Sequence, residues 1–336
     1  MLSLGVSFAD VSITGSINQT VGSWKDGGVI AKNSFTALGD RNLASGDSLL
    51  TFAGSEDLGD GLKASFKFEP RVNISGKDVS ESTQKGLFGE NREAWIGLNG
   101  AFGTVHLGNN YTPLFLQSGA GYDPNGFTNM TGYLVSNVTS FNATNSIDYT
   151  APKFVDGLGI QLNKNFGGKS KTSSANTPAN EADSFGWGLS YSISGFSAGV
   201  AGENSKYTKL SDGVSEVAAA SSNDLKKLGI SASYDFGVAK VSIQSLNAKL
   251  SSASTNTMGY GLSVPIGAFT LSASISTLKS KGSSTAANND SYNAYQLGAK
   301  YALSKRTSAY FLSSQVKNST DGKTLNVNAA GVVHNF

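Results

Sequence analysis

Apolar and polar residues alternate along most of this chain, and this alternation restricts its possible folds more than any other feature. Between residues 269 and 276, every second residue is apolar and the residues between them are Ser or Thr. The segments 62–71 and 239–250 alternate in a similar way. Because successive side chains of a β-strand point to opposite faces, the pattern predicts strands with one apolar and one polar face. No comparable stretch has a sustained helical period, so the predicted class is all-β.

The connections between the predicted strands fall into two length classes. Short turns are expected at 57–61, 100–103, 194–195, 235–237, 265–267 and 303–306. Long polar loops are expected at roughly 22–46, 74–89, 112–143, 167–183, 205–224, 251–257, 279–290 and 317–324. Short and long connections alternate along the chain, as they do in membrane barrels with tight periplasmic turns and long extracellular loops. A soluble sandwich has no reason to sort its connections in this way.

This pattern divides the chain into sixteen expected strands. They are expected near 11–21, 47–57, 61–73, 90–99, 103–111, 144–152, 158–166, 184–193, 196–204, 225–235, 239–250, 258–265, 268–278, 291–302, 307–316 and 325–336. An even number places both termini at the end with the short turns. Sixteen strands leave a water-filled lumen, whereas side chains fill an eight-stranded barrel. The sequence therefore predicts a 16-stranded antiparallel transmembrane β-barrel, and this architecture implies a channel.

Composition agrees with a membrane barrel and excludes several other classes. Charged residues make up 15% of the 336 residues, whereas about a quarter is usual for soluble proteins. No run of about 18 apolar residues occurs, and a barrel, unlike a transmembrane helix, needs none. Cysteine is absent, which excludes disulfides, thiolate metal sites and cysteine nucleophiles. The net charge of +2 gives no argument for a nucleic-acid partner.

The sequence predicts one domain with a short extension. Residues 1–9 carry no charge, and Ser7-Phe8-Ala9 resembles a small-x-small cleavage site. We expect 1–9 to be a signal-peptide remnant or an N-terminal extension. The chain has only 6 Pro and no Pro-rich or charge-rich linker. We therefore expect 10–336 to form a single barrel domain.

Three segments carry a family resemblance. The segment 54–64, Gly-Ser-Glu-Asp-Leu-Gly-Asp-Gly-Leu-Lys-Ala, resembles the first periplasmic hairpin of the trimeric general diffusion porins of Gram-negative bacteria, especially the β-proteobacterial type. The segment 92–113 resembles their fourth and fifth strands, and the final strand, ending in Phe336, resembles their C-terminal strand. The resemblance implies an outer-membrane location and a homotrimer. It also implies passive diffusion of small hydrophilic solutes and ions, in contact with outer-membrane lipid and lipopolysaccharide.

In that family the third loop folds into the barrel and narrows it, and here this loop would be about 112–143. A loop of this length is uncommon without a function. Its apolar residues could fix it to the inner wall, since a loop exposed to water would not favour so many. These residues are Leu114, Phe115, Leu116, Phe127, Met130 and Leu134. The first five strands and the loop near 74–89 would form the trimer contact, and we expect these strands to carry small or flat outward residues in place of a full lipid face.

The resemblance also implies a constriction with acidic residues opposite a cluster of arginines. The loop contains one carboxylate, Asp123, and we expect Asp123 and Asp148 to face Arg92 and Arg71. Leu49 and Asp148 stand where the family commonly has further arginines. Further candidates for the lumen are Lys63, Lys67 and Glu69 on the polar face of one strand, and Tyr122 and Tyr133 in the loop. With fewer wall arginines and a nearly neutral loop, we expect a weak field and mild ion selectivity.

Other function classes have less support in the sequence. His106 and His334 have no metal-ligand spacing, so no metal site is expected, and no motif indicates a cofactor. No nucleophile elbow or converging acid pair indicates an enzyme, so an outer-membrane hydrolase barrel remains a minor alternative. A channel selective for sugars or organic anions, and an all-β adhesin, also remain open. A sugar channel would need a row of aromatic residues along the lumen.

Overall fold

The computed structural model describes residues 10–29, 33–39, 47–74, 87–118, 124, 140–169, 180–206, 224–250, 253–282 and 290–336. Within them are seventeen strands and one helix. The strands are β1 Asp10–Asp26, β2 Asn33–Gly39, β3 Leu49–Gly59, β4 Leu62–Val72, β5 Phe88–Gly100, β6 Gly103–Tyr111, β7 Asn142–Thr150, β8 Leu158–Lys169, β9 Asn180–Ile193, β10 Phe196–Lys206, β11 Asp224–Asp235, β12 Lys240–Leu250, β13 Ala253–Ile266, β14 Phe269–Lys281, β15 Ser291–Ala302, β16 Thr307–Asn318 and β17 Thr324–Asn335. The helix is α1 Pro113–Ser118.

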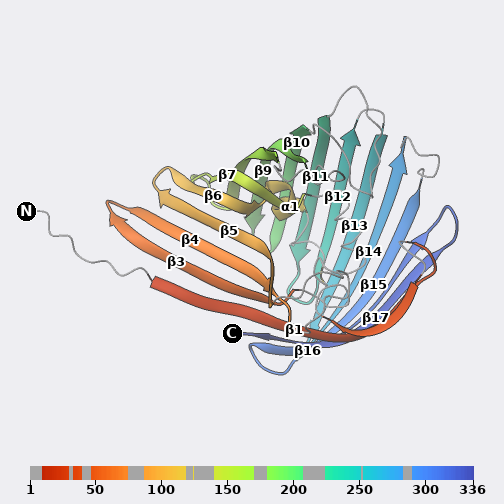
Figure 1. Ribbon diagram of the computed structural model, residues 1–336. Helices are drawn as coiled ribbons and strands as arrows, with labels where there is room; N and C mark the ends of the chain where they lie inside the picture. Colours follow the sequence, from red (N-terminus) through yellow and green to blue (C-terminus); the bar gives the residue numbers. More distant parts are fainter. Residues whose placement is uncertain are drawn as a thin grey trace, which may run out of the picture.

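Sixteen of the described strands form a closed antiparallel ring, which confirms the predicted fold. From β3 to β17 each strand pairs with its neighbour in the chain, and β1 closes the ring by pairing with β17 on one side and β3 on the other. The closing pair runs from Ser16 opposite Asn335 to Asp26 opposite Leu325. Figure 1 shows β1 alongside β17, near the C-terminus. In this ring each of the sixteen described strands pairs with a neighbour on both sides, as a membrane interior requires.

The structure corrects the sequence prediction at three connections. The predicted loop 22–46 contains the end of β1 and a seventeenth strand, β2, which pairs with Thr20–Asp26 beyond the part of β1 that pairs with β3. The predicted loop 251–257 is mostly the start of β13. The predicted loop 112–143 begins with the helix α1, which is too short to give a helical period in the sequence. Among the described residues, no helix is long and apolar enough to cross a membrane.

Short turns at one end of the ring follow from local chemistry. The two residues between β9 and β10, Ser194 and Gly195, have φ values of 45° and 83°, which suit a two-residue hairpin turn whose twist matches the strands. At the turn from β3 to β4, the last residue of β3, Gly59, and the two turn residues, Asp60 and Gly61, all have positive φ. The Asp57 carboxylate accepts a hydrogen bond from the Gly59 amide at 2.9 Å. These turns fix the pairing register of the adjoining strands.

The two faces of the strands differ as predicted. Leu228, Ile230 and Ile243 are 44%, 54% and 42% exposed in the isolated chain, as lipid-facing side chains would be. The residues that alternate with them along the strands point into the ring, and two of these, Ser231 and Gln244, are buried. Residues 1–9, a proposed signal-peptide remnant, lie outside the described residues.

Candidate functional site

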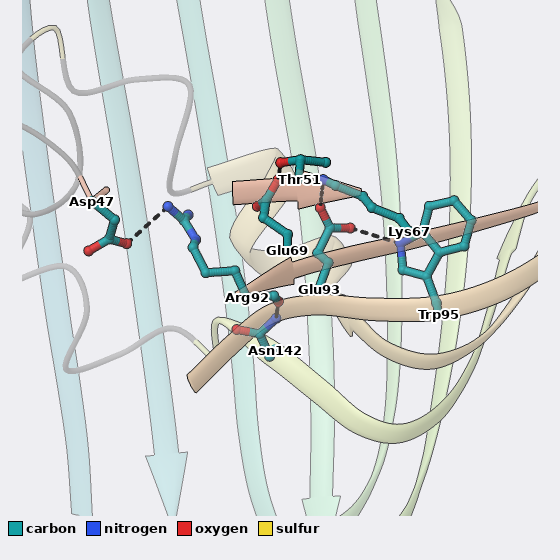
Figure 2. Close-up of polar contacts among 8 residues, drawn as sticks. All are labelled: Asp47, Thr51, Lys67, Glu69, Arg92, Glu93, Trp95 and Asn142. Carbon is teal, nitrogen blue, oxygen red and sulfur yellow. Dashed lines mark hydrogen bonds and ion pairs between the residues drawn. The ribbon is translucent and has the colours of Figure 1, made fainter. Parts of the chain in front are cut away.

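A row of alternating charges lies on the lumen side of β4 and β5. Lys67 forms ion pairs with Glu69, at 2.9 Å, and with Glu93. Thr51 of β3 donates a hydrogen bond to the same Glu69 oxygen at 2.9 Å, and the Trp95 indole donates to Glu93 at 3.2 Å (Figure 2). Because residues two apart on a strand share a face, these side chains line the lumen together.

Both predicted arginines bind one carboxylate. Arg71 Nε lies 3.1 Å, and Arg92 Nη1 3.0 Å, from Oδ2 of Asp47. The Asp47 side chain is 4% exposed, and Figure 2 shows the Arg92 side chain extending toward it. Arg92 also lies over the Tyr111 ring, with Cζ 5.3 Å from the centroid. The Asn142 side chain donates a hydrogen bond to the backbone carbonyl of Arg92.

Among the described residues, the carboxylate that binds Arg92 and Arg71 is Asp47, whereas the sequence pointed to Asp148 and Asp123. Asp148 instead accepts hydrogen bonds from Ser146 at 2.7 Å and from Asn163 on the neighbouring strand β8. Asp148 lies on β7, directly opposite His106 of the neighbouring strand β6. The Asp148 carboxylate thus accepts its hydrogen bonds from small polar side chains. The contact with Arg71 and Arg92 is made by Asp47.

His106 belongs to an aromatic pair in the lumen. Its ring stacks on Trp95 with centroids 3.7 Å apart and planes at 9°. Gly97 lies opposite His106 across the β5–β6 pair, and a Cβ at that position would be only 2.4 Å from the imidazole Cδ2. Glycine is therefore required for the ring to lie flat on Trp95. We call the lumen side of β3–β6, with these charged and aromatic residues, the charged wall.

The opposite part of the lumen wall holds the beginning of the third loop. Helix α1 contacts β8 to β12, mostly β9, β10 and β11. Leu114 is fully buried in a cluster with Ala201 and Leu246, two residues that point into the ring. The inward fold of the third loop is thus confirmed for its described start, and Figure 1 shows α1 beside these strands. Of the other expected anchors, Phe115 packs against Tyr111 and Phe141, and Leu116 is exposed.

Glycines make the space for α1. A Cβ at Gly188 would be 3.0 Å from side-chain atoms of Pro113 and Gln117, and one at Gly199 would be 2.7 Å from the carbonyl oxygen of Gln117. Gln117 also binds β8, where its amide donates to the Gln161 side chain at 2.9 Å. Larger residues on β9 and β10 would displace the helix. We call the lumen side of β8–β12 the anchoring wall.

The returning end of the loop is bound to the same wall. Ser140 donates a hydrogen bond to Glu203 of β10 at 2.8 Å and accepts one from Lys227 of β11. The Glu203 and Lys227 side chains, 4% and 9% exposed, lie 3.5 Å apart. Thr112 joins the two ends of the loop, because its hydroxyl binds the carbonyl of Ser140 and accepts from the amide of Phe115 at 3.1 Å.

The remaining candidates are Lys63 and six residues of the third loop. Lys63 is exposed near the short-turn end of β4, outside the ion pairs of the charged wall. Asp123, Tyr122, Tyr133, Phe127, Met130 and Leu134 lie outside the described residues. No group of three or more His, Cys, Asp or Glu side chains that could hold a metal occurs in the described part of the chain.

Sequence reasoning missed several residues that the structure brings together. Asp47 stands at the end of a long loop, and nothing in the sequence links it to arginines 24 and 45 residues away. The alternation could have predicted that Glu93 and Trp95 face the lumen, because they lie on the same strand face as Gly97. Glu203 and Lys227 are polar residues on a predicted lumen face. The repeated glycines of β9, Gly186 and Gly188, could have indicated a close neighbour in the lumen.

A comparison with protein families decides what the chain is. The model of the Gram-negative porin family matches residues 2–321. The chain belongs to that family. The porin is 26% identical over 330 residues to the major outer membrane protein P.IB of Neisseria gonorrhoeae, which covers 90% of the porin and 87% of the relative. It is therefore an outer-membrane protein of a Gram-negative bacterium, as the sequence predicted.

Solved structures share the fold of the porin. The anion-selective porin from Comamonas acidovorans matches with a TM-score of 0.72 and 23% identity, over 98% of this porin and 100% of that chain. OmpT of Vibrio cholerae in its trimer form matches with a TM-score of 0.68 and 12% identity, over 98% and 99%. At these identities the two structures show the sixteen-stranded barrel alone.

Proposed function

We propose that the porin is a weakly selective channel for passive diffusion of small hydrophilic solutes and ions. The observation that carries the proposal is the pairing of charges within the charged wall. Arg71 and Arg92 share Asp47, and Lys67 lies between Glu69 and Glu93. Opposite charges a few ångströms apart largely cancel at longer range, and salt screens the remainder over about 8 Å at physiological ionic strength. A passing ion then experiences a weak net field.

We propose further that the loop 112–143 sets the narrowest cross-section. Support comes from its two ends, since α1 is packed on the anchoring wall and Ser140 is bound to Glu203 and Lys227. The lumen candidates would then be Arg92, Arg71, Lys67, Glu69 and Asp148, with Asp123, Tyr122 and Tyr133 contributed by the loop. Lys63 would act at most as a charge near the periplasmic mouth.

A selective sugar or organic-anion channel has less support. A sugar channel needs a row of exposed aromatic faces, but one face of Trp95 is covered by His106. The relative from Comamonas acidovorans is described as anion-selective, whereas the arginines here are paired with Asp47. Membership of a porin family supports a channel and gives no support for a hydrolase.

Conductance and solute uptake test the proposal. Single channels of the purified porin in a planar bilayer should conduct in proportion to KCl concentration, because diffusion through a water-filled lumen does not saturate. Liposome swelling should be fast with small neutral sugars and fall with solute size. Conductance that saturates at low concentration, or swelling with one sugar and not with others of similar size, would show a binding site and favour the selective alternative.

We also propose a homotrimer embedded in outer-membrane lipid. The trimer form of the Vibrio cholerae neighbour supports the assembly. We expected small or flat outward residues on the proposed contact side, and the exposed residues there include the flat Phe68 together with the larger aliphatic Val11, Ile13 and Ile96, all 51–62% exposed. Leu87 and Phe88 are also exposed, at the long-loop end of β5, where a neighbouring subunit would cover them. Native mass measurement in mild detergent should give three copies, and a stable monomer would contradict the assembly.

A further inference from the structure

Asp47, the carboxylate that binds both arginines, lies beside a gap in the pairing of β1. In the described strands, β1 pairs with β3 up to Ser16 and with β2 from Thr20 onward, and the residues between them pair with neither. Gly39 lies opposite Thr20, and Leu49 lies opposite Ser16. The chain advances ten residues from Gly39 to Leu49 while β1 advances four, so it contains six residues more than regular pairing needs. Asp47 belongs to this insertion.

The Ser48 hydroxyl fills the gap. The backbone groups of successive strand residues point to opposite edges, and Gly15 exchanges its two hydrogen bonds with Phe336, on the β17 side. Asn18 is therefore the residue in the gap whose N–H and C=O point away from β17. Its N–H donates to Ser48 Oγ at 2.9 Å, and its C=O accepts from the same hydroxyl at 3.1 Å. One side chain thus takes the place of a paired strand.

The backbone beside this hydroxyl is bound on two sides. The carbonyl of Ser48 accepts a hydrogen bond from the amide of Val72 on β4 at 2.9 Å. The Ser16 hydroxyl of β1 donates to the carbonyl of Asp47 at 3.2 Å. Ser48 and Asp47 are 2% and 8% exposed. The segment is therefore fixed between β1 and β4, next to Arg71, and Figure 2 shows the Asp47 carboxylate directed at the charged wall.

The gap residue of β1 is itself held from the far side of β17. Tyr310 of β16 lies opposite Gly331 of β17, which lies opposite Thr20 of β1. A Cβ at Gly331 would be 2.5 Å from the Tyr310 Cζ, so glycine allows the ring to lie across β17. The Tyr310 hydroxyl donates to Asn18 Oδ1 at 2.6 Å and also forms a hydrogen bond with the Thr20 hydroxyl. Both the side chain and the backbone of Asn18 are thus fixed.

These contacts determine where a charge lies without adding one. Ser48 is neutral, and its hydroxyl binds the backbone of β1, so it influences the arginines through the position of Asp47. Opposite charges in contact largely cancel at longer range, and the cancellation weakens as they separate. A carboxylate displaced from Arg71 and Arg92 would leave the charge of the lumen unchanged but would make its field at the charged wall more positive.

We propose that Ser48 is a positioning residue for ion selectivity, with Ser16 as a second, weaker support. Ser48 holds Asp47 against Arg71 and Arg92 by replacing the missing strand partner of Asn18. The insertion between β2 and β3 thereby delivers a carboxylate into the lumen and keeps it at one place. This inference rests on the proposed function, because it explains how the weak field of the channel is maintained.

Reversal potentials of the full-length porin in a KCl gradient test the proposal. Ser48→Ala changes no charge and should shift the potential toward anion preference, by about twofold in the permeability ratio. Ser48→Thr keeps the hydroxyl and should behave like the parent. Ser276→Ala removes a hydroxyl that is equally buried on β14, outside the charged wall, and should also behave like the parent. An unchanged potential in Ser48→Ala, or the same shift in either of the other variants, would overturn the proposal.

A double-variant comparison shows whether Ser48 acts through Asp47. In an Asp47→Asn background, Ser48→Ala should cause no further shift, and a shift of the same size there would overturn the proposal. Ser16→Ala removes the hydroxyl bound to the Asp47 carbonyl and should shift the potential less than Ser48→Ala, in the same direction. If Ser48→Ala does not yield a folded barrel, Ser16→Ala decides, and an unchanged potential then contradicts the positioning of Asp47 from β1.

Thiol labelling provides a readout that does not depend on conduction. The chain contains no cysteine, so Asp47→Cys introduces a single thiol at a position whose side chain is 4% exposed. A negatively charged methanethiosulfonate should modify D47C/S48A about tenfold faster than D47C, because the segment loses two buried hydrogen bonds. Equal rates would overturn the role of Ser48. A strongly selective or non-conducting parent would instead refute the proposed function, and the labelling rates would still decide whether Ser48 holds this segment.

Discussion

The charged wall and the anchoring wall are built from the same strand geometry but use their inward positions differently. On β4 and β5 these positions hold Lys67, Glu69 and Glu93, which bind one another. On β9 and β10 they hold Gly188, Gly199 and Ala201, which leave room for α1. The difference separates two properties of a channel. One wall sets the electrostatic field, and the other sets the position of the loop that narrows the lumen.

The largest expected effect comes from the anchoring wall. Leu114→Ala should destabilise the packing of α1 by about 2–5 kcal/mol, because it leaves a cavity where Leu114 is fully buried against Ala201 and Leu246. Single-channel conductance should become noisy and change in size, with ion selectivity kept. Leu116→Ala removes the same atoms at an exposed position and serves as the control. If both variants behave alike, packing of α1 does not hold the loop.

A second prediction concerns the return of the loop. Glu203→Gln should cost about 1–3 kcal/mol of unfolding free energy, because it leaves the nearly buried Lys227 without its carboxylate. Heat dissociation followed by gel mobility measures the loss. Removing both charges, in E203Q/K227Q, should recover part of it, and no recovery would mean that the ion pair is not the source of the effect. Asp321→Asn, in the exposed pair with Lys323, should have less effect.

On the charged wall, Arg92→Gln should move the reversal potential toward cation preference. One charge about 10 Å from the ion path acts with about 1–2 kcal/mol at an effective dielectric constant of 20, which gives a severalfold change in the permeability ratio. Lys63→Gln removes the same charge at an exposed position outside the wall and should shift the potential less. Equal shifts would show that total lumen charge, and not position on the charged wall, determines selectivity.

The smallest effect is expected at Gly97. Gly97→Ala should push the His106 ring off Trp95, since the new Cβ would clash with the imidazole, and should lose the stacking energy of about 0.5–1.5 kcal/mol. Unfolding monitored by tryptophan fluorescence measures the change. In a His106→Ala background the same substitution should be close to neutral, and an equal loss there would mean that stacking is not the reason for glycine at this position.

The sequence predicted the barrel well because lipid and water impose opposite faces on every strand, so alternation reports directly on the fold. It also placed Arg71, Arg92, Lys67, Glu69 and Asp148 on polar faces. Their partners depend on register and on side-chain reach across strands, which alternation does not encode. The sequence therefore did not predict that Asp47, at the end of a loop, binds Arg71 and Arg92.

The anchoring wall was less predictable for a different reason. The sequence feature that makes room for α1 is the absence of side chains at Gly186, Gly188 and Gly199. Glycines in strands also occur at bulges and bends, so the sequence alone does not tell which of them lie against another segment. The apolar residues of the loop indicated an inward fold, and only the structure shows that Leu114 inserts between β10 and β12 side chains.

The reversal potential of the porin and of Asp47→Asn in a KCl gradient tests the central claim most directly. Asp47 is a shared partner of Arg71 and Arg92, so its replacement takes one negative charge away from two guanidinium groups at once. We expect a small reversal potential for the parent and a clear shift toward anion preference in the variant. A strongly selective parent, or a variant with unchanged reversal potential, would contradict the claim that paired charges on this wall keep the field of the channel weak.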